Sequence, residues 1–370
     1  MKVGITGANG FVAWHLRCSL EIRSDIEEVR LAARDTFANP NKMREFVHGL
    51  DAIFHLAGIN RASDQDLEEG NVMLARCLTN ALHEDGGMPA VVFSSSTHAV
   101  EPSTAYGLGK SASAKVFDDW ARGAGARFIE MIIPHVFGEF GRPDYNSAVA
   151  TFCHRIANGE EPEIINDSQL ELIHVQDLVD EMFSAVEDGR QGQIRMEGVP
   201  ISVSSVAEKL KQFHALYLSH GIVPDLTNAF DRSLFNSLRS YIGCSVFPIL
   251  PQVHSDPRGW LFEAVKVHSG GQCFVSSTNP GVTRGNHFHR RKFERFVVLS
   301  GEAVIKIRKL FSSDVVELVV GKEGPACVDM LTLHTHSITN IGDGPLLTLF
   351  WADELFDKDN PDTYFEEVLI

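Results

Sequence analysis

The sequence predicts two fold classes in one chain, an α/β doubly wound parallel sheet followed by an all-β barrel. Three observations lead to this prediction. Short apolar runs alternate with amphipathic stretches over the first two-thirds of the chain, and a glycine-rich loop, GANG, follows the first run. After about residue 243, short β-type runs are separated by Gly, Asp, Asn and Pro. We therefore expect one domain at residues 1–243 and a second at 244–370.

Composition narrows the class of protein. A chain of 370 residues, 44% of them hydrophobic, can build two cores. The net charge of −16 argues against a nucleic-acid partner, and no apolar run approaches the ~18 residues of a membrane span. The six cysteines are scattered without a CxxC pair, which indicates reduced thiols. With the first strand expected to begin at Met1 and no leader ahead of it, we expect a cytoplasmic protein.

The α/β part is predicted from its alternation of elements. Strands are expected at 1–6, 29–33, 52–56, 90–94 and 128–134, and helices near 11–22, 71–85 and 105–122. Alternation of this kind is typical of a parallel sheet with helices on both faces.

The first turn carries features of a nucleotide site. Gly7, Gly10 and Ala13 in GANGFVA are small enough for the backbone to approach a pyrophosphate at the N-terminus of a helix. Arg34 ends the second strand, where an acidic residue would hold the ribose hydroxyls of NAD. An arginine suits a 2′-phosphate, so NADPH is favoured, although Asp35 follows directly and keeps NADH as the alternative.

The stretch FSSSTHAVEPSTAYGLGK carries candidate catalytic groups. Ser96 follows a strand, and Tyr106 and Lys110 are spaced to share one face of a helix. A nearby ammonium is expected to lower the pKa of the tyrosine, which makes its phenol a usable proton donor for an alcohol–ketone interconversion. The Ser96 hydroxyl can hold the same substrate oxygen.

Together, GANGFVA, HLAG, SSS and YGLGK resemble the extended short-chain dehydrogenase/reductase family. The resemblance covers about residues 1–240 and implies a Rossmann-type fold with Ser96, Tyr106 and Lys110 as the catalytic triad. It also implies a nicotinamide cofactor held by Gly7, Gly10, Phe11, Val12, Arg34, Leu56, Ala57, Gly58, Tyr106 and Lys110.

The chain departs from this family in two places. Ala13 replaces the third glycine of the loop, which should only tighten helix–strand packing. His135 replaces an asparagine on the substrate side. The segment 141–152 falls where family members bind the nucleotide of a sugar nucleotide, so Arg142 and Asn146 are candidate substrate contacts, with ordinary loop residues as the alternative.

The second domain contains a metal-type motif. Its spacing, G-x5-H-x-H-x4-E-x6-G, includes His287, His289 and Glu294. Residues i and i+2 of a strand share a face, so both histidines are expected to point into the barrel. His336, followed by Asn340, would complete a four-ligand site for a divalent metal.

These residues resemble the cupin superfamily, whose second motif is partial here, with Leu331 and Leu333 at its Pro and Gly positions. The segments DPRGWLFE and TRGNHFH also resemble sugar-nucleotide epimerases of the dTDP-4-keto-rhamnose type. By that resemblance Arg258 and Arg284 contact a diphosphate. His287 would then stand at the position of the base, and we favour its role as metal ligand because ligation occupies a ring lone pair.

The fusion of the two parts resembles a family of bifunctional capsular polysaccharide enzymes. That resemblance implies C3 epimerisation of a UDP-4-keto-6-deoxy-N-acetyl sugar in the cupin half, followed by NADPH-dependent C4 reduction to UDP-2-acetamido-2,6-dideoxy-β-L-talose, on the route to UDP-N-acetyl-L-fucosamine. It also implies a zinc ion and a homodimer. Asp256, His334 and Lys306 remain open candidates for the C3 base.

Three alternatives remain. In the first, the cupin is a dimerisation or binding module and the chain only reduces C4. In the second, the chain is a non-catalytic NADPH sensor, which the retained Tyr106–Lys110 pair disfavours. In the third, it is a 4-epimerase that keeps NAD bound, against which Arg34 argues.

Overall fold

The computed structural model describes residues 1–369. Contacts divide the chain into two compact units, one formed by residues 1–137 and 169–201, the other by 138–168 and 202–370. The consecutive domains 1–243 and 244–370 remain a prediction. Within the described residues, no helix is both long enough and apolar enough to cross a bilayer.

The first unit contains the predicted parallel sheet. Its order is β2 (Glu28–Ala32), β1 (Lys2–Thr6), β3 (Ala52–His55), β4 (Ala90–Ser94), β5 (Phe128–Ile132) and β8 (Gly192–Arg195), and every neighbouring pair is parallel. After β2 the chain crosses to the other side of β1. Ligands bind at the carboxyl ends of the strands at such a reversal of strand order, which here lies between β1 and β3.

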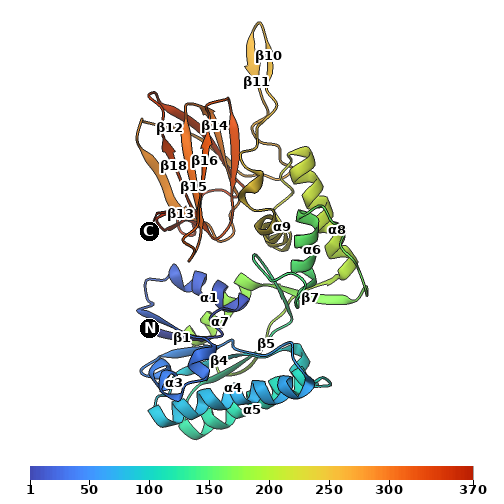
Figure 1. Ribbon diagram of the computed structural model, residues 1–370, viewed down its shortest axis with the longest axis vertical. Coiled ribbons are helices and arrows are strands. Elements are labelled where there is room, and N and C mark those ends of the chain that lie inside the picture. Colours follow the sequence, from blue (N-terminus) through green and yellow to red (C-terminus); the bar gives the residue numbers. More distant parts are fainter. Residues whose placement is uncertain (370) are drawn as a thin grey trace. The chain divides into compact units, whose positions relative to one another are not determined.

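Helices cover both faces of this sheet (Figure 1). On one face lie α1 (Phe11–Glu21) and α7 (Val175–Glu187); on the other lie α3 (Pro40–Val47), α4 (Asp64–Asp85) and α5 (Ala105–Ala124). The alternation of β4 shows why both faces are needed, because Val92 packs in the first core whereas Val91 and Phe93 pack in the second. The expected α/β fold is therefore confirmed.

Shorter elements complete this unit. A single turn, α2 (Arg34–Phe37), follows β2, and a 3₁₀ turn, η1 (Thr97–Ala99), follows β4. A small sheet is formed by β6 (His135–Phe137), β7 (Gln169–His174) and β9 (Val199–Ser202).

The second unit contains the predicted all-β barrel. One sheet has the order β12 (Gln272–Thr278), β19 (Leu346–Ala352), β14 (Glu294–Ser300) and β17 (Ala326–Met330). The other has the order β16 (Val315–Val320), β15 (Ala303–Lys309), β18 (His334–Asn340), β13 (Thr283–Phe288) and β20 (Tyr364–Phe365). Apolar side chains from both sheets, among them Phe296, Ile305, Val328 and Ile338, form one core.

The same unit includes helices that precede the barrel in sequence, α6 (Ala148–Ala157), α8 (Val203–His214) and α9 (Ala229–Ile242), with the short turns η2 (Ala215–Ser219) and η3 (Cys244–Val246). Buried polar contacts bind them to β17, because Arg239 donates to the Met330 carbonyl at 2.6 Å and Tyr217 donates to Asp329 at 2.7 Å. A hairpin of β10 (His254–Asp256) and β11 (Gly259–Leu261) consists entirely of exposed residues.

Candidate functional site

The glycine-rich turn between β1 and α1 is shaped by close backbone contacts. Gly7 has a φ of 70°, and a Cβ there would lie 2.8 Å from the amide nitrogen of Ala57. Gly10 is the N-cap of α1, and Ala13 is fully buried in the core beneath. Only glycine fits the position of Gly7 without strain, so the turn leaves the first amides of α1, starting at Phe11 and Val12, open to an anion.

The segment after β3 lies against this turn. Ala57 donates its amide hydrogen to the Thr6 hydroxyl at 3.1 Å, and the same hydroxyl lies 3.1 Å from Nδ1 of the buried His55. These bonds place Leu56, Ala57 and Gly58 at the carboxyl end of the sheet beside β1. The structure therefore brings two of the predicted cofactor-binding segments together at the reversal of strand order.

Arg34 lies exposed at the first position of α2. Its neighbour Asp35 is engaged by Lys42, whose Nζ lies 2.7 Å from the Asp35 carboxylate. A hydrogen bond from Lys42 lowers the pKa of Asp35 below its ordinary value. Lys42, which was not predicted from the sequence, therefore engages the acidic group that could bind a ribose hydroxyl at this strand end, and Arg34 is its neighbour in the chain.

The three candidate catalytic residues occupy the end of β4 and helix α5. Ser96 is 8% exposed and accepts a hydrogen bond from the His98 amide at 3.3 Å. Lys110, 4% exposed, donates to the Ser94 carbonyl at 2.7 Å and lies 5.9 Å from the centre of the Tyr106 ring. The structure thus places the phenol and the ammonium on one side of α5.

The ionisation of these groups differs in part from the expectation. Burial lowers the pKa of Lys110 from 10.5 to about 8. Burial raises the pKa of Tyr106 above its ordinary value, whereas the sequence led us to expect a lowered one. The physical reason is that a buried phenolate loses its hydration, and the ammonium 5.9 Å from the ring does not offset that loss. Tyr106 is therefore held in the protonated, proton-donating form.

Asn71 of α4 belongs to the surroundings of Lys110 but was not predicted. Its side chain exchanges two hydrogen bonds with the backbone of Ile59, each 2.9 Å long, and donates a third to the Leu67 carbonyl. A Cβ at Gly58 would lie 3.3 Å from Lys110 Nζ and 3.4 Å from Asn71 Oδ1. In the sequence, the feature that could have indicated Asn71 is its position as a single amide side chain on the apolar side of an amphipathic helix.

Two histidines stand beside the candidate proton donor. The ring centres of His98 and Tyr106 are 6.4 Å apart, and those of His98 and His135 are 6.5 Å apart. Partial burial, followed by the charge of His98, lowers the pKa of His135. The departure from the usual asparagine therefore places a second imidazole, neutral at pH 7, at this end of the sheet.

The candidate substrate arginines lie in the second unit. Arg142 is exposed and stacks over the Tyr145 ring at 4.9 Å, next to the exposed Asn146. Arg258 lies in the turn of the β10–β11 hairpin, where its side chain is bound to Asp256 at 2.5 Å. Arg284 on β13 donates to the Thr278 hydroxyl at 2.8 Å. Their role in substrate binding remains a prediction.

The four predicted metal ligands converge inside the barrel. One ligand atom each from His287, His289, Glu294 and His336 lies within 4.8 Å of the others. His287 is the penultimate residue of β13, Glu294 begins β14 and His336 lies on β18, directly across from His287. His289 lies just beyond β13, and its Nε2 is 3.1 Å from Glu294 Oε2. The G-x5-H-x-H-x4-E spacing thus predicted a real cluster.

The protonation states of His287 and Glu294 suit metal binding. Burial would lower the pKa of His289, but its hydrogen bond with Glu294 raises it overall. Burial lowers the pKa of His287 to about 3, and the charges of His336 and His289 add to the effect. Burial alone would raise the pKa of Glu294, but the hydrogen bond with His289 and the nearby imidazole of His336 lower it overall. A neutral imidazole and an ionised carboxylate are the forms that ligate a metal.

The donor set also fits a metal on structural grounds. Within the described residues, Nε2 of the fully buried His336 has no hydrogen-bond partner, and its nearest carboxylate oxygen, on Glu294, is 3.5 Å away. Its Nδ1 faces the His334 carbonyl at 3.2 Å, so the ring is oriented from behind. A buried nitrogen without a partner, facing a carboxylate and two more imidazoles, matches the needs of zinc or a similar divalent ion.

The turn before β18 contains Leu333 at the position where the motif usually has glycine. Leu333 adopts a φ of 59° and donates its amide hydrogen to the His289 carbonyl at 2.8 Å. A left-handed leucine costs roughly 1–3 kcal/mol, which this buried side chain offsets by packing. The hydrogen bond from Leu333 therefore joins the turn before His336 to the main chain of His289.

Comparison with known proteins agrees with this architecture. The NAD dependent epimerase/dehydratase family matches residues 3–196, and the polysaccharide biosynthesis C-terminal domain matches residues 254–364. The chain is 35% identical over 370 residues to UDP-2-acetamido-2,6-beta-L-arabino-hexul-4-ose reductase of Pseudomonas aeruginosa, with 98% of both chains covered. It is 26% identical to UDP-glucose 4-epimerase of Rickettsia typhi over 57% of this chain and 69% of the relative.

A solved structure matches from end to end. The crystal structure of the capsular polysaccharide assembling protein CapF from Staphylococcus aureus superposes with a TM-score of 0.62 and 30% identity, covering 100% of both chains. The match includes the parallel sheet and the barrel alike, which confirms the expected fold class and the resemblance to capsular polysaccharide enzymes, of which CapF is one. The chain belongs to the NAD dependent epimerase/dehydratase family and carries a polysaccharide biosynthesis C-terminal domain after its dehydrogenase part.

Proposed function

We propose that the chain is a bifunctional sugar-nucleotide enzyme that epimerises C3 and then reduces C4 of a UDP-2-acetamido-2,6-dideoxy-4-keto-hexose. The product would be UDP-2-acetamido-2,6-dideoxy-β-L-talose, on the route to UDP-N-acetyl-L-fucosamine for capsule or O-antigen polysaccharide. The observation that carries the reductase half is the arrangement of Ser96, Tyr106 and the buried Lys110 beside a pyrophosphate-type turn. The relative from Pseudomonas aeruginosa is named as a 4-ulose reductase, in agreement with C4 as the reduced carbon.

The reduction follows from these groups. NADPH, when bound, supplies the hydride to C4. Tyr106, protonated because it is buried, donates its proton to the C4 oxygen, and the Ser96 hydroxyl donates a hydrogen bond to the same atom. Lys110 stabilises the phenolate that results, and the Ser94 carbonyl keeps the ammonium in place. Arg34 and Lys42 supply the positive charge that supports NADPH over NADH.

The epimerase half rests on the barrel. A 4-ketone acidifies the proton on C3, so a base in the barrel can remove it, and a solvent-derived proton delivered to the opposite face completes the inversion. His287, His289, Glu294 and His336 would hold a divalent metal, with zinc favoured, which would supply Lewis-acid positive charge to the barrel site. Of the open candidates for the base, Asp256 is exposed and bound to Arg258, Lys306 is bound to Glu317, and His334 is buried two residues before a ligand.

A direct experiment combines the purified protein, the UDP-4-keto-6-deoxy-N-acetylhexosamine and NADPH in D₂O, with the product analysed by NMR. Deuterium at C3 together with a reduced C4 supports both activities. Tyr106→Phe should abolish reduction but leave deuterium exchange at C3. Glu294→Gln should abolish deuterium exchange at C3 but still reduce C4 of a substrate that is already epimerised. A product without deuterium at C3 contradicts the epimerase half.

A reduced product without deuterium at C3 would favour the second candidate function. This candidate is an NADPH-dependent 4-ketoreductase in which the cupin serves dimerisation or binding. The many exposed residues of the β10–β11 hairpin, with Trp260 and Leu261 about three-fifths exposed, favour a contact role for part of this unit. A homodimer in the cytoplasm is part of the same proposal, and the free state of all six cysteines agrees with a reducing compartment. Light scattering of the purified chain tests the dimer.

A further inference from the structure

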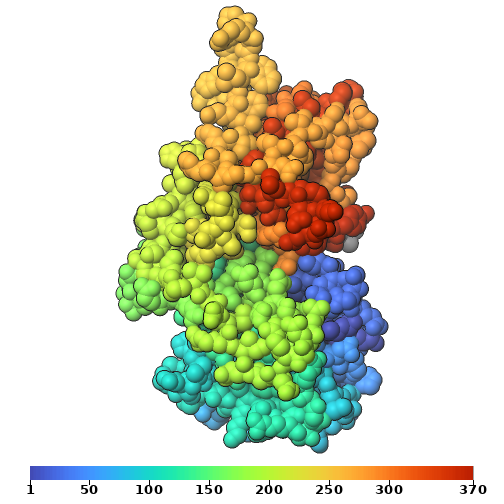
Figure 2. Space-filling view, turned by 180° about the vertical axis from the view of Figure 1, so that it is seen from behind, coloured from blue at the N-terminus to red at the C-terminus, as the bar shows by residue number. Residues whose placement is uncertain are grey.

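The segment after β19 contains an aspartate whose environment differs from that of its neighbours. Figure 2 shows the C-terminal residues, in red, as a patch on the surface of the second unit, beside the barrel strands in orange. Asn360 and Thr363 are exposed there, but Asp362 between them is completely buried. Its φ of 44° is left-handed, a conformation that an aspartate adopts more readily than most residues.

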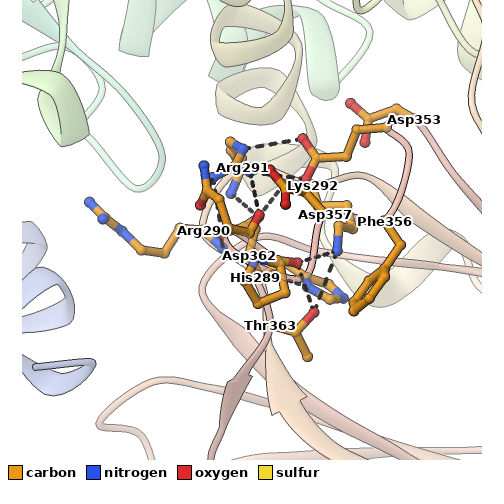
Figure 3. Close-up of polar contacts among 12 residues, drawn as sticks. His289, Arg290, Arg291, Lys292, Asp353, Phe356, Asp357, Asp362 and Thr363 are labelled. Carbon is orange, nitrogen blue, oxygen red and sulfur yellow. Dashed lines mark hydrogen bonds and ion pairs between the residues drawn. The ribbon is translucent and has the colours of Figure 1, made fainter. Parts of the chain in front are cut away.

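The carboxylate of Asp362 binds the loop that follows the first two metal-type histidines. Its Oδ1 accepts the Arg290 amide hydrogen at 3.0 Å, and its Oδ2 accepts those of Arg291 at 2.9 Å and Lys292 at 2.8 Å (Figure 3). Three consecutive amides converge on one buried carboxylate. This arrangement fixes the loop between His289 and β14 and compensates for the burial of the charge.

The main chain of the same residue holds a candidate ligand directly. Nδ1 of His289 lies 2.5 Å from the Asp362 carbonyl oxygen. A carbonyl only accepts hydrogen bonds, so Nδ1 carries a proton, and Nε2 is the ring nitrogen left to ligate a metal. That Nε2 is the atom facing Glu294, at 3.1 Å. One residue therefore sets both the tautomer and the orientation of His289.

Neighbouring contacts keep this residue in place. Lys292 Nζ donates to the Pro361 carbonyl at 2.6 Å, and Arg291 donates to Asn360 Oδ1 at 3.3 Å. Just beyond, β20 pairs with β13, with Phe365 opposite His287. The 360–365 segment thus contacts both histidines of the motif from outside the cluster.

We propose that Asp362 is a positioning residue for the metal centre, through which the 360–363 segment controls how tightly the metal is held. The inference rests on the proposed metal site. Hydrogen-bond partners of this outer kind fix ring orientation and ligand basicity, and their loss costs about 10–100-fold in metal affinity. The Asp362 carboxylate holds the loop in register, and its carbonyl then meets His289 at the angle that the cluster requires.

The test measures the affinity of the metal-free full-length chain for Zn²⁺ by competition with a chelator, and the absorption bands of the Co²⁺ form. Asp362→Ala should weaken Zn²⁺ binding by about 10–100-fold and shift the Co²⁺ bands. Asp362→Asn keeps one acceptor oxygen and tolerates the left-handed backbone, so its loss should be roughly tenfold or less. The matched control is Asp359→Asn, which removes the same charge from an exposed aspartate of the same segment and should bind Zn²⁺ as the unaltered chain does.

The outcomes separate the inference from the function on which it rests. If the unaltered chain binds Zn²⁺ and Glu294→Gln weakens that binding, the metal site stands. Should Asp362→Ala and Asp362→Asn then bind Zn²⁺ with unchanged affinity, while only the thermal stability of the metal-free protein falls, Asp362 is a structural residue and the positioning role is wrong. If the unaltered chain and Glu294→Gln bind Zn²⁺ equally weakly, the metal site itself is wrong.

Discussion

The ammonium of Lys110 and the main-chain carbonyl of Ser94 form a part-buried hydrogen bond, with Nζ and O 2.7 Å apart. This bond joins α5 to the carboxyl end of β4, where the Phe93 ring centre lies 4.8 Å from Nζ. Burial lowers the pKa of this lysine from 10.5 to about 8. The folded chain therefore keeps a charged group at a site that penalises the charge, next to the phenol of Tyr106.

Replacing Lys110 with methionine should stabilise the cofactor-free protein while abolishing C4 reduction. The lysine is charged in the unfolded chain at pH 7, and folding transfers that charge into a site that lowers its pKa from 10.5 to about 8, which corresponds to roughly 3 kcal/mol. Loss of the bond to Ser94 subtracts about 1 kcal/mol from the gain. Urea unfolding at pH 7, with NADPH oxidation as the activity assay, measures both effects.

The pH dependence checks the cause. Because the folded pKa is lowered, the penalty is complete below about pH 8 and disappears as the pH rises toward 10.5, where the unfolded lysine also loses its proton. The stability difference between Lys110→Met and the unaltered protein should therefore shrink over that window. A variant less stable than the unaltered protein at pH 7 would contradict this account.

The preference for NADPH should depend on two cations. Arg34→Ala and Lys42→Ala should each lower kcat/KM with NADPH by about 10–100-fold and change kcat/KM with NADH by much less, since a charge-assisted bond to a phosphate contributes about 1.5–3 kcal/mol. Arg44→Ala is the matched control, because Arg44 is paired with Glu84 on α4. Equal losses with both cofactors would show that neither cation distinguishes a 2′-phosphate.

Removal of the metal should affect the two reactions differently. Dialysis against a chelator should abolish deuterium exchange at C3 and leave NADPH-dependent reduction of an epimerised substrate within about twofold. It should also lower the stability of the barrel unit, by about 4 kcal/mol when the metal had been present at 1,000 times its Kd. Calorimetry with and without Zn²⁺ checks the stability, and a loss of both reactions on chelation would contradict the separation of roles.

Much of this molecule follows from local sequence patterns. The alternation of strands and helices predicted β1 to β5 to within a few residues, because a parallel sheet needs apolar residues on both faces of each strand. The spacing of His287, His289 and Glu294 predicted the cluster, because strand geometry fixes which side chains share a face.

The features that the sequence did not indicate depend on contacts between separate elements. Asp362 reaches His289 across 73 residues, from a segment that reads as a polar loop. Lys42 reaches Asp35 from the next helix, and the burial that raises the pKa of Tyr106 comes from several elements at once. Hydrophobic periodicity predicts helices and strands but not which side chains of separate elements meet, so these contacts could be found only in the structure.

His135 should influence substrate binding more than cofactor binding. Its ring lies 6.5 Å from that of His98, which in turn lies 6.4 Å from Tyr106, and its lowered pKa keeps it neutral at pH 7. His135→Asn, which restores the usual residue, should change the KM for the UDP-sugar by roughly 2–10-fold, the size of one hydrogen bond, and leave the KM for NADPH unaltered.

As the pH falls below the ordinary histidine range, the KM of the unaltered enzyme for the UDP-sugar should change because the His135 imidazole gains a proton, whereas that of the asparagine variant should stay closer to constant. Steady-state kinetics from pH 5.5 to 8 tests this, with His83→Asn on the exposed last turn of α4 as the control. Parallel pH profiles for His135→Asn and the unaltered enzyme would place His135 outside the substrate site.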